Sequence, residues 1–183
     1  MTEKKFSWVT DEDVAAANEK FEAAKKNYAA GKFLNAQAYC QSALRLNPND
    51  AKKIKFLLGL IHLELGTSSS HWDFNDSIAA CDYFDAVIEL DPTCAEAYLY
   101  NGIAVVHWGN NWQLAKNFFD KTLELEPENL IARKYREVCV KLIDDDFNAA
   151  QKLLNEAVEL RGKKNITHLR LNQIIIEEIL TGE

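Results

Sequence analysis

The 183-residue sequence predicts an all-α protein built as a stack of helical hairpins. The chain has only seven glycines and three prolines, and it is rich in alanine, leucine, glutamate and lysine, which favour helix. Each proline follows the end of an amphipathic run, and a glycine lies upstream of each run. The prolines are Pro48, Pro92 and Pro127, and the glycines are Gly31, Gly66 and Gly109.

This order predicts a repeating unit of helix, short turn, helix and proline turn. In residues 21–29 and 34–46, apolar side chains recur at steps of three and four, which is typical of an amphipathic helix. A proline ends the second helix because it has no N–H to donate and disfavours the α conformation in the residue before it. One hairpin cannot bury both of its faces, so a stable protein needs several units stacked together.

The pattern resembles the tetratricopeptide repeat, a helix–turn–helix unit of 34 residues. Residues 17–50 fit one repeat without a gap, and three more follow at 51–94 (with an insertion at 67–76), 95–129 and 130–165. The matching residues of the first repeat are Ala24, Tyr28, Gly31, Phe33, Ala36, Ala43 and Pro48. The resemblance implies a right-handed superhelical stack of about four hairpins whose first helices line a concave groove, the usual peptide site.

Both ends of the array are expected to be capped. Residues 1–16 form an N-terminal extension and the start of the first helix. Thr10 and Asp13 have the spacing of a capping box, so this helix should begin near Asp11. Residues 166–183 are predicted to form a C-terminal solvating helix over the last hairpin, and the alternative is a free docking helix.

Charge and composition weigh against several classes of protein. The net charge of −7 disfavours a generic binder of nucleic acid or anionic membranes. No apolar stretch approaches the roughly 18 residues of a membrane span, and the start lacks the apolar core of a signal peptide. The four cysteines lack metal-site or redox spacing, so we expect a cytoplasmic protein with reduced thiols.

The sequence contains no recognisable catalytic or cofactor-binding motif, neither a phosphate-binding loop nor a zinc or nucleophile signature. We therefore expect a protein that is not an enzyme and that holds no cofactor and no metal. The stack could bring His62 and His107 together, but a histidine in a groove is more often a polar contact than a metal ligand.

Helical spacing and the resemblance together predict which side chains face the groove. From the first repeat these are Asn18, Phe21, Lys25 and Tyr28, and from the second Lys52, Lys55, Gly59 and His62. From the third and fourth they are Glu96, Leu99, Ile103 and Val106, then Ile131, Lys134, Val138 and Lys141. The apolar second half indicates a groove for an extended apolar peptide or an amphipathic helix of another protein. The alternative is that the last helix, or a second copy of the chain by self-association, fills the groove.

The family's dicarboxylate clamp, which holds the acidic tails of chaperones, is not reproduced. It needs a lysine and an asparagine in one first helix, an asparagine in the next, and a lysine and an arginine in the third. Counted from the first repeat, these places hold Phe21, Lys25, Phe56, Glu96 and Tyr100. Counted from the second repeat, they hold Lys55, Gly59, Tyr100, Ile131 and Tyr135, so neither frame reproduces the clamp. Binding of such tails is therefore not expected.

The insertion and the charge distribution suggest further contacts. Trp72 and Phe74 lie in the insertion, where they either anchor it on a neighbouring repeat or contact a partner. Asp76 should cap the next helix. Residues 56–115 hold eight acids and neither lysine nor arginine, which could steer a basic partner to the middle repeats; solvated outer helix faces explain the same charges.

The function predicted from these observations is a non-catalytic protein–protein interaction adaptor. The alternatives are a chaperone for an export or assembly client and a structural subunit of a larger complex.

Overall fold

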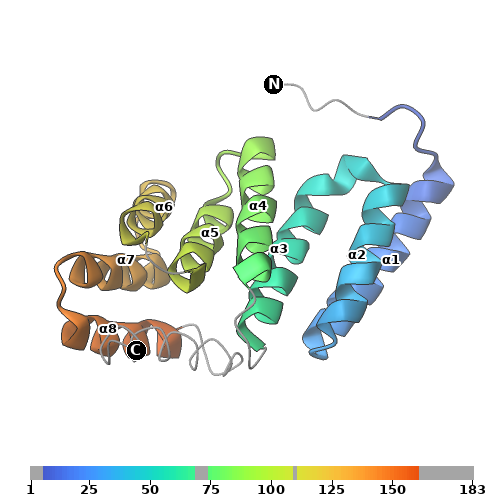
Figure 1. Ribbon diagram of the computed structural model, residues 1–183. Helices are drawn as coiled ribbons and strands as arrows, with labels where there is room; N and C mark the ends of the chain where they lie inside the picture. The colour runs from blue at the N-terminus through green and yellow to red at the C-terminus, as the bar shows by residue number, and fades with distance from the viewer. Residues whose placement is uncertain (1–5, 69–73, 109–110, 161–183) are drawn as a thin grey trace.

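The computed structural model describes residues 6–68, 74–108 and 111–160, in which eight α-helices and one 3-10 helix follow one another (Figure 1). The helices are α1 (Asp11–Ala29), α2 (Phe33–Leu46), η1 (Pro48–Asp50), α3 (Ala51–Ser68), α4 (Phe74–Leu90), α5 (Ala95–Trp108), α6 (Trp112–Leu125), α7 (Leu130–Ile143) and α8 (Phe147–Leu160). No strand occurs in these residues, so the all-α prediction is confirmed for them. The predicted repeat boundaries remain a prediction.

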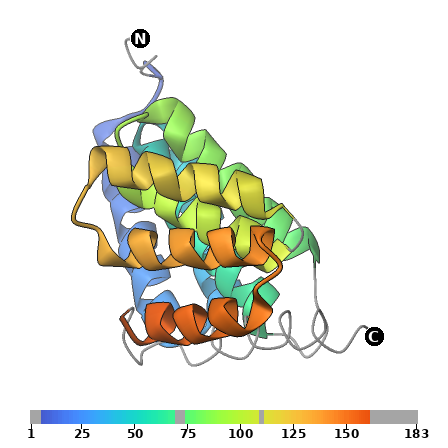
Figure 2. The same ribbon diagram turned by 90° about the vertical axis from the view of Figure 1, so that its left-hand side faces the viewer.

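The helices form four hairpins that stack in sequence order. Each first helix packs on its own second helix, and α2, α4 and α6 also pack on the helix that opens the next hairpin. Helices α1 to α4 run steeply in Figure 1 while α7 and α8 run across it, so the helix direction turns along the stack. Figure 2 shows α6, α7 and α8 side by side at one end. This is the predicted stack of helical repeats.

The start of α1 confirms the predicted capping box. The Asp13 N–H donates to Thr10 Oγ1 at 3.1 Å, and the Thr10 N–H donates to Asp13 Oδ2 at 3.0 Å. These bonds satisfy backbone donors that have no partner within the helix. The bonds from the Thr10 side chain and backbone also lower the pKa of Asp13.

Two glycines let paired helices approach closely. A Cβ on Gly59 would lie 2.7 Å from the Phe84 ring, and one on Gly102 would lie 2.7 Å from the Phe119 ring. The Phe119 ring in turn stacks on Tyr135 of the next hairpin at 5.5 Å. Each of these contacts therefore joins the two helices of one hairpin, and Phe119 continues into the next hairpin.

Among the residues that the structure describes, the buried apolar side chains form two clusters rather than one. The smaller cluster joins α1, α2 and α3 and includes Ala24, Cys40 and Ile61. The larger one runs from Leu63 near the end of α3 to Ala157 in α8. Helix α3 contributes to both, so the seam between the clusters follows this helix.

The second hairpin differs from its prediction in how it uses its extra residues. Helix α3 has 18 residues and α4 has 17, against 14 in each of α5 to α8, so much of the insertion is helical. Gly66 lies inside α3 instead of in a turn, and its close approach to Ser77 lets the two longer helices stay in contact. Asp76 is not a cap but lies inside α4, where it contacts His62 of α3.

The structure describes only part of the predicted insertion contacts and none of the predicted C-terminal helix. Phe74 begins α4, and its side chain is not among those described. Trp72 and the predicted C-terminal helix at 166–183 lie outside the described residues.

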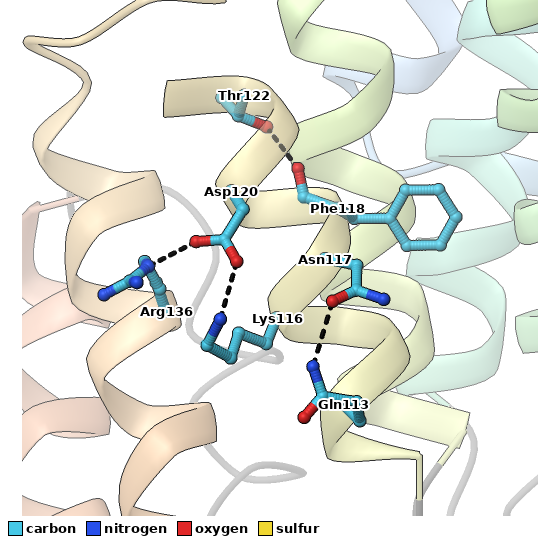
Figure 3. Close-up of polar contacts among 7 residues, drawn as sticks. All are labelled: Gln113, Lys116, Asn117, Phe118, Asp120, Thr122 and Arg136. Atoms are coloured by element: carbon cyan, nitrogen blue, oxygen red, sulfur yellow. Dashed lines mark hydrogen bonds and ion pairs between the residues drawn. The ribbon is translucent and has the colours of Figure 1, made fainter. Parts of the chain in front are cut away.

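Polar contacts complete the packing of α6 against α7 (Figure 3). Asp120 accepts a hydrogen bond from Lys116 one turn earlier in α6, at 2.6 Å, and another from Arg136 of α7. Desolvation works to raise the pKa of Asp120, but these two cations outweigh it and lower the pKa. The acid therefore links the two hairpins in its charged form.

Two further findings concern membranes and thiols. Among the described helices, none is both long and apolar enough to cross a bilayer. Cys40, Cys81, Cys94 and Cys139 are all free; Cys40 and Cys139 are buried, whereas Cys81 and Cys94 are only partly buried.

Candidate functional site

A pocket of about 720 Å³ opens on the side of the stack formed by α1, α3 and the start of α5. Helices α1 and α5 both contact α3, which places the pocket along α3 with one neighbour on each side. Its lining residues are Phe21, Lys25, Asn49, Asp50, Lys52, Lys53, Phe56, Leu57, Val87, Cys94 and Glu96. We call it the α1–α3 pocket.

Apolar side chains form the inner surface of the α1–α3 pocket. Phe56 is half-buried and meets the rings of Phe84 and Tyr100 edge-on, at 5.7 and 5.8 Å between centroids. These contacts hold Phe56 in one orientation. Phe21, also half-buried, packs against the smaller core cluster from α1. An apolar side chain entering between Phe21 and Phe56 would find a rigid, preformed surface on both sides.

Two lysines flank the Phe21 ring. The Nζ atoms of Lys25 and Lys53 lie 5.5 and 5.4 Å from the ring centroid, within the range of cation–π attraction. Lys25 also pairs with Glu22 at 2.6 Å, and Lys53 pairs with Asp50 at 2.7 Å. The α1 side of the pocket therefore carries cations whose charges are already matched within the chain.

The opposite side of the pocket is organised by Asp91 in the turn before α5. Its carboxylate accepts hydrogen bonds from Lys52 and from the N–H and hydroxyl of Thr93, at 3.0 and 2.6 Å for Thr93. The bond from Lys52, helped by those from Thr93, lowers the pKa of Asp91 to about 2. The same bond raises the pKa of Lys52. The side chains of Lys52 and Asp91 therefore stay charged and paired across the physiological range.

Cys94 and Glu96 complete this side. Desolvation raises the pKa of the Cys94 thiol, and its Sγ donates to Glu96 Oε2 at 3.7 Å. Glu96 is exposed in the first turn of α5.

The structure brings together part of the predicted groove. Four of the predicted residues line the α1–α3 pocket: Phe21, Lys25, Lys52 and Glu96. Tyr28, farther along α1, is half-buried and packs on Phe33, with its hydroxyl 3.4 Å from Glu64 Oε1. Tyr28 is therefore part of the contact between helices rather than of the pocket lining.

In α3 the pocket lining agrees only in part with the prediction. The predicted Lys52 lines the pocket, but Gly59 packs on Phe84 and Lys55 is not among the lining residues. Lys53 and Phe56 line the pocket instead. The reason is that α3 is apolar over most of its circumference from Ile54 onward, so its sequence does not fix which face turns inward.

His62 is likewise buried between helices instead of facing a groove. Its Nδ1 lies 2.7 Å from Asp76 Oδ1 of α4, its Nε2 lies 3.0 Å from Gln37 Nε2 of α2, and its ring stacks on Tyr83 at 5.3 Å. His62 thus joins the first two hairpins as a polar contact. Among the described residues, no group of three or more side chains has the arrangement of a metal site.

Most of the apolar residues predicted for the second half of the groove belong to the core. Ile103 and Val138 have 0% exposure, Val106 has 3% and Leu99 has 6%. Ile131 is half-buried against the same cluster. In this structure these side chains are not available to a peptide. Their apolar character, which in the sequence indicated a groove, reflects burial in the core instead.

The two predicted lysines of α7 also have other contacts. Lys134 pairs with Glu156 of α8 at 2.8 Å, and Lys141 pairs with Asp146 in the turn between α7 and α8 at 3.5 Å. They hold the last hairpin together at its surface.

Sequence reasoning missed several pocket residues. Asn49 and Asp50 come from the 3-10 turn after Pro48, and Val87 and Cys94 from α4 and the turn that follows it. The repeated proline turns were the signal that could have found Asn49, Asp50 and Cys94, because each turn lies beside the start of the following first helix.

Comparisons with known proteins agree with this architecture. No family model and no curated protein sequence matches the chain, but solved structures do. The first tetratricopeptide domain of Spaghetti (RPAP3), bound to the HSP90 peptide SRMEEVD, aligns with a TM-score of 0.64 and 17% identity, over 75% of this chain and 99% of that one. The chain has the tetratricopeptide-repeat fold. The resemblance drawn from the proline and glycine spacing is thus confirmed at the level of fold.

Two other tetratricopeptide domains support the same conclusion. That of Arabidopsis OM64 aligns with a TM-score of 0.59 and 22% identity, over 70% of this chain and 98% of that one. The C-terminal tetratricopeptide-containing domain of an FK506-binding protein of Plasmodium falciparum aligns with a TM-score of 0.63 and 20% identity. This alignment covers 75% of this chain and 95% of that one. Such domains are protein-interaction modules, and identities this low establish the tetratricopeptide fold and not a particular partner.

Proposed function

We propose that this tetratricopeptide protein is a non-catalytic adaptor that binds a peptide segment of another protein in the α1–α3 pocket. The observation that carries the proposal is the pocket itself, with two aromatic rings on its inner surface and exposed polar residues at its edges. A preformed apolar surface with a few polar groups around it is the usual form of a binding site.

The tetratricopeptide fold supports a peptide as the ligand. The Spaghetti (RPAP3) domain was solved with a bound peptide, and this chain covers 99% of that domain. The α1–α3 pocket lies along first helices of the stack, where the resemblance to the repeat family placed the groove. We also propose the cytoplasmic location that the spacing of the four cysteines in the sequence predicts.

The test is capture of protein partners by a variant that alters only the pocket. Phe21→Ser removes one ring of the apolar surface, and Tyr39→Ser removes an aromatic side chain from α2, 37% exposed and outside the pocket, as the matched control. Partners that wild type and Tyr39→Ser retain, and that Phe21→Ser loses while keeping its helical circular dichroism, are the expected result. Retention of every partner by Phe21→Ser would place the binding surface elsewhere.

A further inference from the structure

We infer that the segment bound in the α1–α3 pocket is basic and apolar: it places one apolar side chain between Phe21 and Phe56 and a lysine or arginine beside Glu96. This inference rests on the proposed function and adds the chemistry of the partner. It reverses the charge of the acidic chaperone tails that dicarboxylate clamps hold.

The charges around the pocket leave one carboxylate without an ion-pair partner in the described part of the chain. The three lysines of the pocket each have an acidic partner in the chain: Lys25 pairs with Glu22, Lys53 with Asp50 and Lys52 with Asp91. Glu96 is left over, because no ion pair joins it to a lysine or arginine of the described residues. Its hydrogen bond is the weak one from the Cys94 thiol, at 3.7 Å. The pocket and its immediate ion-pair partners therefore carry one negative charge more than they carry positive charges.

The chain on both sides of Glu96 is acidic. Residues 56–115 include eight acids and no lysine or arginine, so α4 and α5 add only formal negative charge. Asp91 lies in the turn between these two helices, and both Asp91 and Glu96 act on the charge of Lys52. Lys52 is the cation that reaches this side, and it is held by Asp91. A cationic side chain of a partner would meet a favourable potential here, and a carboxylate would be repelled.

Glu96 also occupies a position of the repeat that bears on the charge of a ligand. Counted from the first repeat, the place where a dicarboxylate clamp carries its third-helix lysine is occupied here by Glu96, and the asparagine of the second helix is replaced by Phe56. The first change reverses the charge, and the second replaces a hydrogen-bonding amide with an apolar ring. Both changes favour a basic, apolar ligand over an acidic one.

The experiment compares two labelled peptides by fluorescence polarisation. They have the same length and the same leucines, with both ends blocked, and every polar position is lysine in one and glutamate in the other. Wild type should bind the lysine peptide about 5-fold or more tightly than the glutamate peptide, and the preference should shrink as salt is raised. Phe21→Ser should weaken binding of the lysine peptide, because the apolar anchor is lost.

Charge-reversed variants locate the contact. Glu96→Lys should weaken the lysine peptide by about 3- to 10-fold and strengthen the glutamate peptide. Glu89→Lys is the matched control, since it makes the same charge change at an exposed residue outside the pocket, and it should change either affinity by less than about 2-fold.

The outcomes separate this inference from the proposed function. Equal or tighter binding of the glutamate peptide overturns the inference, and so does an effect of Glu89→Lys as large as that of Glu96→Lys. If wild type binds the glutamate peptide and Phe21→Ser does not, the pocket still binds peptides and only the charge assigned to its ligand is wrong. Failure of both peptides to bind also overturns the inference, while partner capture decides the adaptor function independently.

Discussion

Substitution of Gly102 by alanine tests whether the helices approach as closely as the structure shows. A Cβ at this position of α5 would lie 2.7, 2.8 and 3.0 Å from three carbons of the Phe119 ring in α6. Ordinary carbon–carbon contacts are about 3.5–4.0 Å, so the ring or the helix must move by several tenths of an ångström or more. Phe119 has 0% exposure and stacks on Tyr135, also 0% exposed, so the ring has little room to retreat.

The expected magnitude is a balance of two effects. Overpacking of a rigid core costs about 1–3 kcal/mol, whereas alanine is favoured over glycine in a helix by about 1 kcal/mol. Because the buried Phe119 ring has little room to move, we take the upper part of the overpacking range, about 2–3 kcal/mol, and expect Gly102→Ala to lower the free energy of unfolding by about 1–2 kcal/mol. For a chain of this length the midpoint of thermal unfolding would fall by roughly 2–8 °C.

Urea unfolding followed by circular dichroism measures the effect, and a second substitution tests its cause. Phe119→Leu on top of Gly102→Ala removes the ring atoms that clash, so the double variant should lose less stability than the two single losses added together. Gly66→Ala is the control, because its nearest neighbour is the small Ser77 hydroxyl at 3.1 Å, and it should change stability little. A Gly102→Ala protein more stable than wild type, or strictly additive effects in the double variant, would refute the close approach of α5 and α6.

Three further predictions follow from named contacts. The Asp91 carboxyl should titrate near pH 2 by NMR, and Lys52→Met should move its pKa toward the ordinary value of about 3.9. Because the folded-state pKa is lowered, the stabilisation is present above the unfolded value and is lost as the pH falls through about 2. Val138→Glu places a charge at a site with 0% exposure and should destabilise the fold by about 3 kcal/mol or more, measured by thermal unfolding. Cys139, buried with its pKa raised to about 12 by burial, should resist iodoacetamide in the native protein, whereas Cys94 at the pocket edge should react first by mass spectrometry.

The features that the sequence predicted well are those set by local chemistry. The capping box at Thr10 and Asp13 involves residues three apart, so its geometry follows from the spacing alone. The turn at Gly31 has a φ of 70°, a left-handed conformation that glycine adopts without strain. The helix ends before Pro48 and Pro92 follow from the missing N–H of proline. None of these depends on which hairpin packs where.

The candidate site was harder to predict because it depends on helix rotation. A helix with one polar and one apolar face reveals its orientation, as α8 does with its buried Ala150, Leu154 and Ala157. Helix α3 contributes to two core clusters and is apolar on several sides, so a shift of one residue leaves its pattern almost equally good. Only tertiary packing, through the contact of Gly59 with Phe84, determines that Phe56 faces the pocket.

The place of the pocket in the stack predicts how a bound segment would act on the fold. Leu57 belongs to the smaller cluster, to which Phe21 is attached, while Phe56 packs against the larger one, so the pocket lies across the seam between the clusters. The first hairpin packs on the second less extensively than the later hairpins pack on each other. A segment that fills the pocket would add apolar contacts to both clusters and so strengthen this junction. Because a ligand that binds only the folded state stabilises it, unfolding of the first hairpin should be the step that a bound partner suppresses most.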